Sequence, residues 1–261
     1  MKVHNIYFSP TGGTKKAADI VSQALADGQN VTETDLSVHG EDYSRYQFKE
    51  GDLCIVAVPS YGGRVPAIAA ERLASMSGGG AKAILMAVYG NREFEDTLVE
   101  LEDTLTAAGF TCVAAIGALA EHSIACQYGA GRPDKEDQAK LQEFAVEIKR
   151  HLSGEHMTEE SDSSWIPGKR PYKPFGIVSL KPWADDTCTM CGSCAAKCPV
   201  QAIPAENPRE TNTEICIACM RCRSICPVHA RKLDQTVLDG LVQRLAKVCR
   251  DRKENTLYLR N

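Results

Sequence analysis

The chain has 261 residues, of which 43% are hydrophobic and 25% charged, and its formal net charge is −4. These values are ordinary for a soluble globular protein of about two domains, and neither half is basic enough to indicate nucleic-acid binding as its main role. The longest apolar runs, such as 53–59, are too short to span a membrane, and the first residues show no apolar signal core. We therefore expect a cytoplasmic protein without a membrane span.

Residues 1–153 alternate between apolar, strand-like runs and segments of helical periodicity. Runs typical of strands occupy 3–8, 31–36, 53–58, 83–88 and 111–119. Apolar residues at helical spacing lie in 17–25, 66–74, 94–108 and 141–152. The continuous apolar run at 53–58 is typical of a strand that is covered on both faces. This alternation predicts an α/β domain with a doubly wound sheet of five parallel strands.

The loop after the first strand, with the sequence S-P-T-G-G-T, is rich in hydroxyl groups and glycine. A helix follows it directly, and the free amides and partial positive charge of a helix N-terminus suit a phosphate group. The loop has neither the spacing of nucleoside triphosphatases nor that of dinucleotide-binding folds. The residues expected to hold the phosphate are Ser9, Thr11, Gly12, Gly13 and Thr14.

S-P-T-G-G-T directly after a first strand resembles the phosphate loop of the flavodoxins. The resemblance implies an FMN-binding domain whose five parallel strands lie in the order 2-1-3-4-5. FMN then lies at the switch point between the first and third strands. Because the fifth strand, 111–119, runs without interruption, the domain is similar to the short-chain flavodoxins.

The resemblance also indicates the loops after the third and fourth strands, which flank the flavin ring in flavodoxins. Tyr61 is then expected to stack on the ring or lie at its edge, an ordinary loop aromatic being the alternative. Gly62 and Gly63 are expected to provide a peptide that reorients when the flavin is reduced. Asn91 is expected either to contact the flavin edge or to cap its loop. The expected ring contacts are Pro59, Ser60, Tyr61, Gly62, Gly63, Arg64, Tyr89, Gly90, Asn91 and Arg92.

Arginines in both ring loops depart from the acidic surroundings of the flavin in classical flavodoxins. Arg64 and Arg92 are expected to stabilise the negative charge that develops on reduction, which predicts a less negative flavin potential. Phe94 is expected in the core of the domain. His122, after the fifth strand, is expected at the surface without a catalytic role, an approach to the flavin being the alternative.

Residues 154–182 break the alternating pattern and predict an interdomain linker. The stretch is polar and acidic up to residue 164, and the prolines after it indicate an extended segment. Its aromatic residues are unusual for a free linker, so we expect them to pack onto one domain or to cover a metal cluster. These residues are Trp165, Tyr172, Phe175 and Trp183.

Two cysteine runs follow, and each matches the iron–sulfur spacing C-x2-C-x2-C-x3-C-P at every position. They repeat at an offset of 28 residues, 216 minus 188. In this pattern the fourth cysteine of each run ligates the cluster of the other run, which predicts two [4Fe–4S] clusters. One ligand set is Cys188, Cys191, Cys194 and Cys226. The other is Cys216, Cys219, Cys222 and Cys198.

Zinc sites and disulfide bonds are the alternative uses of these cysteines. C-x2-C pairs also bind zinc, but zinc sites do not require eight cysteines in this phase. A disulfide framework is typical of short secreted chains, which this sequence does not resemble. Of the remaining cysteines, Cys54 and Cys112 are expected to be core residues, and we assign no redox role to Cys126 or Cys249.

The last part of the chain predicts an amphipathic helix over 237–248, with Thr236 and Asp239 resembling a capping box. We expect the helix to cover the cluster module or to bridge it to the first domain. The predicted organisation is a flavodoxin-like domain at 1–153, a linker at 154–182, a small α+β dicluster ferredoxin domain at 183–233, and a helix and tail at 234–261.

The whole chain resembles the flavodoxin–ferredoxin fusion proteins of anaerobic microbes. The resemblance implies electron transfer between FMN and two [4Fe–4S] clusters, with unidentified redox proteins as external donor and acceptor. One alternative is a flavin-dependent reductase that is fed by the clusters, which needs a substrate pocket and a proton donor. Another is a sensor of redox state or oxygen, which would carry an output domain.

Overall fold

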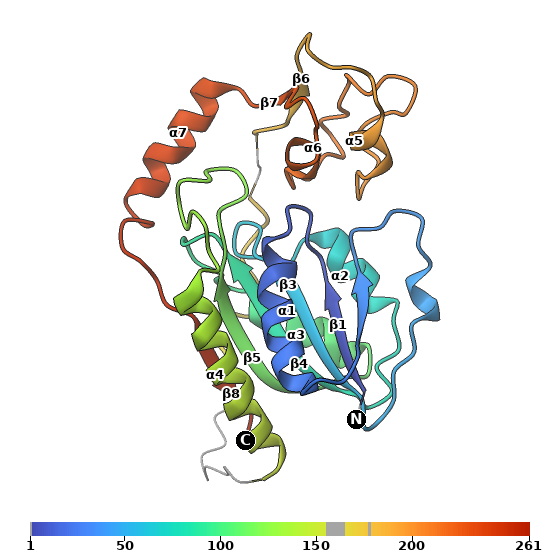
Figure 1. Ribbon diagram of the computed structural model, residues 1–261, viewed down its shortest axis with the longest axis vertical. Coiled ribbons are helices and arrows are strands. Elements are labelled where there is room, and N and C mark those ends of the chain that lie inside the picture. The colour runs from blue at the N-terminus through green and yellow to red at the C-terminus, as the bar shows by residue number, and fades with distance from the viewer. Residues whose placement is uncertain (1, 155–164, 177–178) are drawn as a thin grey trace.

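The computed structural model describes residues 2–154, 165–176 and 179–261. Six strands form one sheet in the order β2-β1-β3-β4-β5-β8, with helices on both faces (Figure 1). The elements are β1 (Val3–Tyr7), α1 (Gly13–Ala26), β2 (Val31–Asp35), η1 (Tyr43–Arg45), β3 (Leu53–Pro59), α2 (Ala67–Ala74), β4 (Lys82–Tyr89), α3 (Thr97–Ala107), β5 (Thr111–Leu119), α4 (Lys135–Leu152) and β8 (Thr256–Leu259). The first five strands are parallel and follow the order 2-1-3-4-5, which confirms the predicted doubly wound fold.

Successive residues of the central strands face opposite helical layers. In β3, Val56 packs in the core formed with α2 and α3, whereas Ile55 packs in the core formed with α1 and α4. Every side chain from Leu53 to Val58 is buried, as expected for a strand that is covered on both faces. This packing holds the carboxyl ends of β1, β3, β4 and β5 at one edge of the sheet (Figure 1).

The strand β8 adds an antiparallel edge that the sequence patterns did not predict. Leu257 pairs with Ile116 of β5, and Leu259 pairs with Ala114. The tail therefore covers what would otherwise be an open strand edge. It also ties the far end of the chain to the first domain.

A small domain lies across the carboxyl ends of the parallel strands (Figure 1). It contains β6 (Trp183–Ala184), α5 (Ser193–Ala196), α6 (Arg221–Ser224) and β7 (Arg231–Lys232). The strands β6 and β7 pair in antiparallel fashion. The helices begin 28 residues apart, 221 minus 193, so the repeat of the cysteine runs is also a repeat of the backbone.

The helix α7 (Gln235–Ala246) runs from the small domain along the first domain toward β8 (Figure 1). The predicted capping box at Thr236 and Asp239 is wrong, because the side chain of Asp234 caps the helix and accepts from the amide of Val237 at 3.0 Å. Apolar residues of α7 pack against both domains, which confirms the expected bridge: Leu238 beside Met220 of the small domain, and Leu245 beside Ala125.

The segment that precedes the small domain is anchored along α3. The indole nitrogen of Trp165 donates to Glu102 at 2.6 Å, and the hydroxyl of Tyr172 donates to Asp103. Both rings also contact the core of the first domain, as expected for linker aromatics that pack onto a domain. In the described part of the chain, we find no helix with the length and apolarity needed to cross a membrane.

Candidate functional site

The eight cysteines of the two runs divide into two sets of four, each around its own cavity. The first set comprises Cys188, Cys191, Cys194 and Cys226, and the second Cys198, Cys216, Cys219 and Cys222. In each set, three cysteines come from one run and the fourth from the other. We call them the outer set and the inner set, because the second set faces the first domain, as described below.

The small domain presents these cysteines through the same local structure twice. Met190 and Ala218 have positive φ angles, as do Gly192 and Met220, which cap α5 and α6. The fourth cysteine of each run accepts an amide hydrogen bond from the residue four positions later, at 3.2 Å in both halves. Such bonds favour a negatively charged sulfur, as a cluster ligand requires.

The number of thiols in each set fits a four-iron cluster, which takes four thiolate ligands. Each set of four lines one cavity. Among the residues that the structure describes, no group of three His, Cys, Asp or Glu side chains is placed to hold a single metal ion. Burial raises the pKa of Cys219 and Cys222 to about 12, so these thiols release protons when they bind metal.

A larger cavity, of about 430 Å³, lies between the two domains. Its walls come from the loops after β1, β3, β4 and β5, from residues 175, 176 and 179–181, from the inner cysteine loop and from α7. This is the switch-point edge at which open α/β sheets bind their ligands.

The loop after β1 has the form of a phosphate cradle. Gly12, the N-cap residue of α1, has φ 93° and open space where a side chain would stand, and it makes no side-chain cap hydrogen bond. The hydroxyl of Ser9 accepts from the amide of Lys15 at 2.9 Å and so holds the loop in shape. The amides of the first turn that precede Lys15 fit a phosphate group.

Most of the predicted flavin contacts reach this cavity. Its lining includes Thr11, Gly13, Thr14, Pro59, Ser60, Tyr61, Gly62, Tyr89, Gly90 and Arg92. Residues predicted with them that lie outside the lining are Ser9, Gly12, Gly63, Arg64 and Asn91.

The arginine of the β3 loop is occupied elsewhere. Arg64 forms an ion pair with Glu100, with Nε 2.7 Å from Oε2, and its guanidinium lies over the rings of Tyr172 and Phe175. Its charge is therefore balanced within the first domain. Arg92 does line the cavity, but it donates two hydrogen bonds to Glu95.

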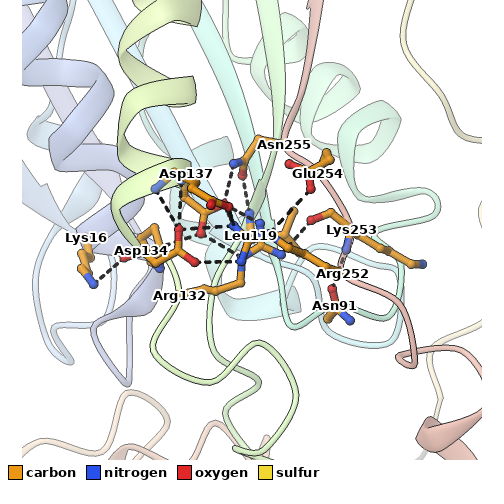
Figure 2. A network of polar contacts seen from close by, with 12 residues as sticks. Lys16, Asn91, Leu119, Arg132, Asp134, Asp137, Arg252, Lys253, Glu254 and Asn255 are labelled. Carbon is orange, nitrogen blue, oxygen red and sulfur yellow. Dashed lines mark hydrogen bonds and ion pairs between the residues drawn. The ribbon is translucent and has the colours of Figure 1, made fainter.

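The amide of Asn91 is directed at the tail. Its Nδ2 donates to the carbonyl oxygens of Cys249 and Asp251 at 3.0 and 2.9 Å, and its Oδ1 accepts from the amide of Lys253 at 3.2 Å. Figure 2 shows this contact beside the network around Asp137. Of the two predicted roles of Asn91, this geometry favours the structural one.

Several residues of the cavity wall were missed by sequence reasoning. His122 was expected at the surface but lines the cavity, and its Nδ1 accepts from the amides of Ile124 and Ala125 at 3.2 Å. Burial, with a smaller contribution from the charge of Arg92, lowers the pKa of His122 to about 4. Other missed residues include Phe175, Lys181, Val237, Leu241, Arg244 and Leu245.

The cavity and the inner cysteine set share a wall. Ile217, between Cys216 and Cys219, lines both the large cavity and the inner cysteine site. Tyr61 also lines the cavity; burial, followed by the nearby Cys219 and Cys216, raises the pKa of this phenol well above its usual value. The inner set is therefore the one beside the cavity.

Comparisons with known proteins match both parts of the chain. Residues 182–227 match the family of the 4Fe-4S dicluster domain, whereas no curated protein was found to match. Similar solved structures include a flavodoxin of Streptococcus pneumoniae TIGR4, with 23% identity over 58% of this chain and 99% of that chain and a TM-score of 0.41. Flavodoxin 2 of Bacillus cereus has 18% identity over 58% and 99%, with a TM-score of 0.43.

A third similar structure is that of a larger redox enzyme. Rubredoxin oxygen:oxidoreductase from Desulfovibrio gigas has 19% identity over 59% of this chain and 36% of that chain, with a TM-score of 0.43. The dicluster match supports a role in electron transfer. The chain therefore joins a flavodoxin-like α/β domain to a 4Fe–4S dicluster domain, as in a flavodoxin–ferredoxin fusion.

Proposed function

We propose that the chain passes electrons between FMN, bound in the 430 Å³ cavity, and two [4Fe–4S] clusters, bound by the outer and inner cysteine sets. A flavin exchanges one or two electrons and each cluster exchanges one, so the chain would connect two-electron and one-electron redox proteins. The observation that carries this proposal is the position of Ile217, which lines both the cavity and the inner cysteine site.

The residues of the cavity divide into three groups by the part of FMN that they would hold. The loop Ser9–Thr14 offers free amides to the phosphate at the start of α1. Tyr61 and Tyr89 offer aromatic surface to the ring. Apolar residues of α7, such as Leu241 and Leu245, exclude water from the remaining side.

Contacts between the domains support a fixed path from the cavity to the inner set. Arg72 of α2 donates to the carbonyl oxygen of Pro199 at 2.8 Å, next to the inner ligand Cys198. Arg221 donates to Ser37, in the loop after β2, and lies 3.9 Å from Asp35. The outer set lies nearer to the solvent, since Cys191 is exposed, and we propose that external redox proteins of the cytoplasm reach the clusters there.

Cofactor content measured after purification without oxygen tests this proposal. We expect one FMN and roughly eight irons per chain. Iron without flavin would contradict the flavin part of the proposal, and flavin without iron would contradict the cluster part.

A matched pair of glycine variants tests the proposed binding site of the flavin phosphate. Gly12 and Gly28 both have positive φ and open space around them, and they lie at opposite ends of α1. We expect Gly12→Ala to weaken FMN binding without loss of iron, and Gly28→Ala to keep both. Equal loss of FMN in the two variants would argue against the proposed phosphate site.

A further inference from the structure

The two halves of the small domain differ at one buried position beside the clusters. The repeat places Ala202 and Ala230 in equivalent positions, and both donate to a cysteine sulfur. The next residues are Ile203 and Arg231, which are again 28 positions apart. Each is only 3% exposed, so a buried cation replaces a buried aliphatic side chain in the second half.

The guanidinium of Arg231 is held against the outer cysteine set. Its Nη2 donates to the sulfur of Cys194 at 3.4 Å and to the carbonyl oxygen of Pro208. Its Nη1 donates to the hydroxyl of Thr211 at 2.7 Å. Arg231 lines the outer site, whereas Ile203 lines the inner one.

The charge of Arg231 needs an anion, because an unpaired buried charge is costly. In the residues described, its hydrogen-bond partners are carbonyl, hydroxyl and thiol groups, and no carboxylate lies within ion-pair distance of it. A cluster ligated by four thiolates is the anion that this position provides. Its negative charge increases with each added electron, so a neighbouring cation favours reduction.

The inner set has two cations nearby, and in the described structure neither donates to a ligand sulfur. Lys181 donates to the backbone carbonyl of Cys216, and the charge of Arg221 is shared with an acidic side chain. Arg221 lines the inner site, yet its guanidinium is directed at Ser37 and lies 3.9 Å from the carboxylate of Asp35. The charge of Arg231 also acts on Cys216 and Cys222 of the inner set, but its hydrogen bond to a ligand sulfur goes to Cys194 of the outer set.

We propose that Arg231 gives the outer cluster a higher reduction potential than the inner cluster, so that an electron shared by the pair resides mainly at the outer one. This inference rests on the proposed function. One electron leaves the inner cluster and one enters the outer, with no proton or bond change. Arg231 is thus a tuning residue for the direction of electron flow.

Two measurements on the full chain, loaded with iron and titrated with dithionite, test the proposal. Cys191 is an exposed outer ligand, so Cys191→Ser should alter the EPR signal of the outer cluster only. We expect the altered signal to be the one that appears first during reduction. If the first signal is unchanged and the second is altered, the proposal is overturned.

The second measurement compares Arg231→Met with Ile203→Met, the same replacement at the equivalent position. We expect Arg231→Met to lower the higher of the two cluster midpoints and so to narrow the difference between them. Arg231→Lys, which keeps the positive charge, should restore most of that difference. Ile203→Met should leave both midpoints unchanged. Unshifted midpoints in an iron-loaded Arg231→Met protein would refute the tuning role. If Arg231→Met does not load iron, the proposal is judged by the first measurement, in which Cys191→Ser shows whether the outer cluster is reduced first. Electron transfer from the flavin to the clusters should persist whether or not Arg231 tunes the outer cluster. Failure of this inference is therefore distinguishable from failure of the proposed function.

Discussion

The guanidinium of Arg72, in the helix α2, donates a 2.8 Å hydrogen bond to the backbone carbonyl of Pro199. Arg72 is only 9% exposed, and it also donates to the carbonyl of Leu36 and lies over the ring of Tyr43. A side chain of the first domain thereby holds the polypeptide next to the inner ligand Cys198. This contact holds the inner cysteine set close to the first domain, as electron transfer within one chain requires.

Replacing Arg72 should loosen the docking of the small domain. We expect Arg72→Met to remove a charge-assisted hydrogen bond that is worth about 1.5–3 kcal/mol. Iron and FMN content should stay near wild type, while the rate of flavin-to-cluster transfer falls, as measured by rapid mixing. Arg150→Met, at an exposed position of α4, is the matched control. Equal rates in the two variants would show that the contact does not support transfer.

The tail is expected to depend on Asn255. Its Oδ1 accepts from the amide of Leu119 at 2.9 Å, and its Nδ2 donates to the buried carboxylate of Asp137 at 2.8 Å (Figure 2). Asn255→Ala removes the acceptor of the Leu119 amide and one donor to Asp137, whose carboxylate keeps its hydrogen bonds from Arg132. We therefore expect a loss of about 1–3 kcal/mol in unfolding free energy and faster proteolysis near α7. The exposed Asn30→Ala variant should change neither, and full protease resistance of Asn255→Ala would contradict this role of the tail.

The half-buried His122 should make stability depend on pH. Its folded pKa is about 4, below the usual 6.5, so the unfolded chain binds more protons between these values. The stabilisation is complete above pH 6.5 and is lost as the pH falls toward 4, by up to about 3 kcal/mol. In His122→Asn, whose side-chain oxygen can accept the same amides, chemical unfolding should show a flatter slope over this window. An unchanged slope would mean that His122 is not buried in the neutral form.

The two arginines of the predicted ring loops should behave differently. Arg64→Met breaks its ion pair with the buried Glu100 and is expected to lower stability by about 3–5 kcal/mol, with little effect on the flavin midpoint. Arg92→Ala removes a charge from the cavity wall, so the flavin midpoint should become more negative. A redox titration that finds no change in Arg92→Ala would exclude electrostatic tuning by this residue.

The parallel sheet was predictable because each central strand is one apolar run, as at 53–58, and each helix carries an apolar stripe. The cysteine sets were predictable because iron–sulfur ligation has a fixed spacing. These signals are local in sequence, or repeat at a constant offset, and so do not require knowledge of the tertiary contacts.

The missed features depend on partners far away in the chain. The strand Thr256–Leu259 is short and only half-buried, and it forms because β5 offers a free edge. Arg64 was predicted as a flavin contact, whereas in the structure it forms an ion pair with Glu100 of α3. The surface position expected for His122 is wrong, since α7 and residues 179–181, which are distant in sequence, enclose the same cavity.

Rapid mixing of the fully loaded protein with less than one equivalent of a two-electron reductant, without oxygen, tests the central claim most directly. Flavin absorbance and cluster EPR are followed at several protein concentrations. The account predicts that the flavin is reduced first and that the clusters then gain electrons at a rate independent of protein concentration. A rate that rises with protein concentration, or clusters that stay oxidised while the flavin is reduced, would contradict transfer within one chain.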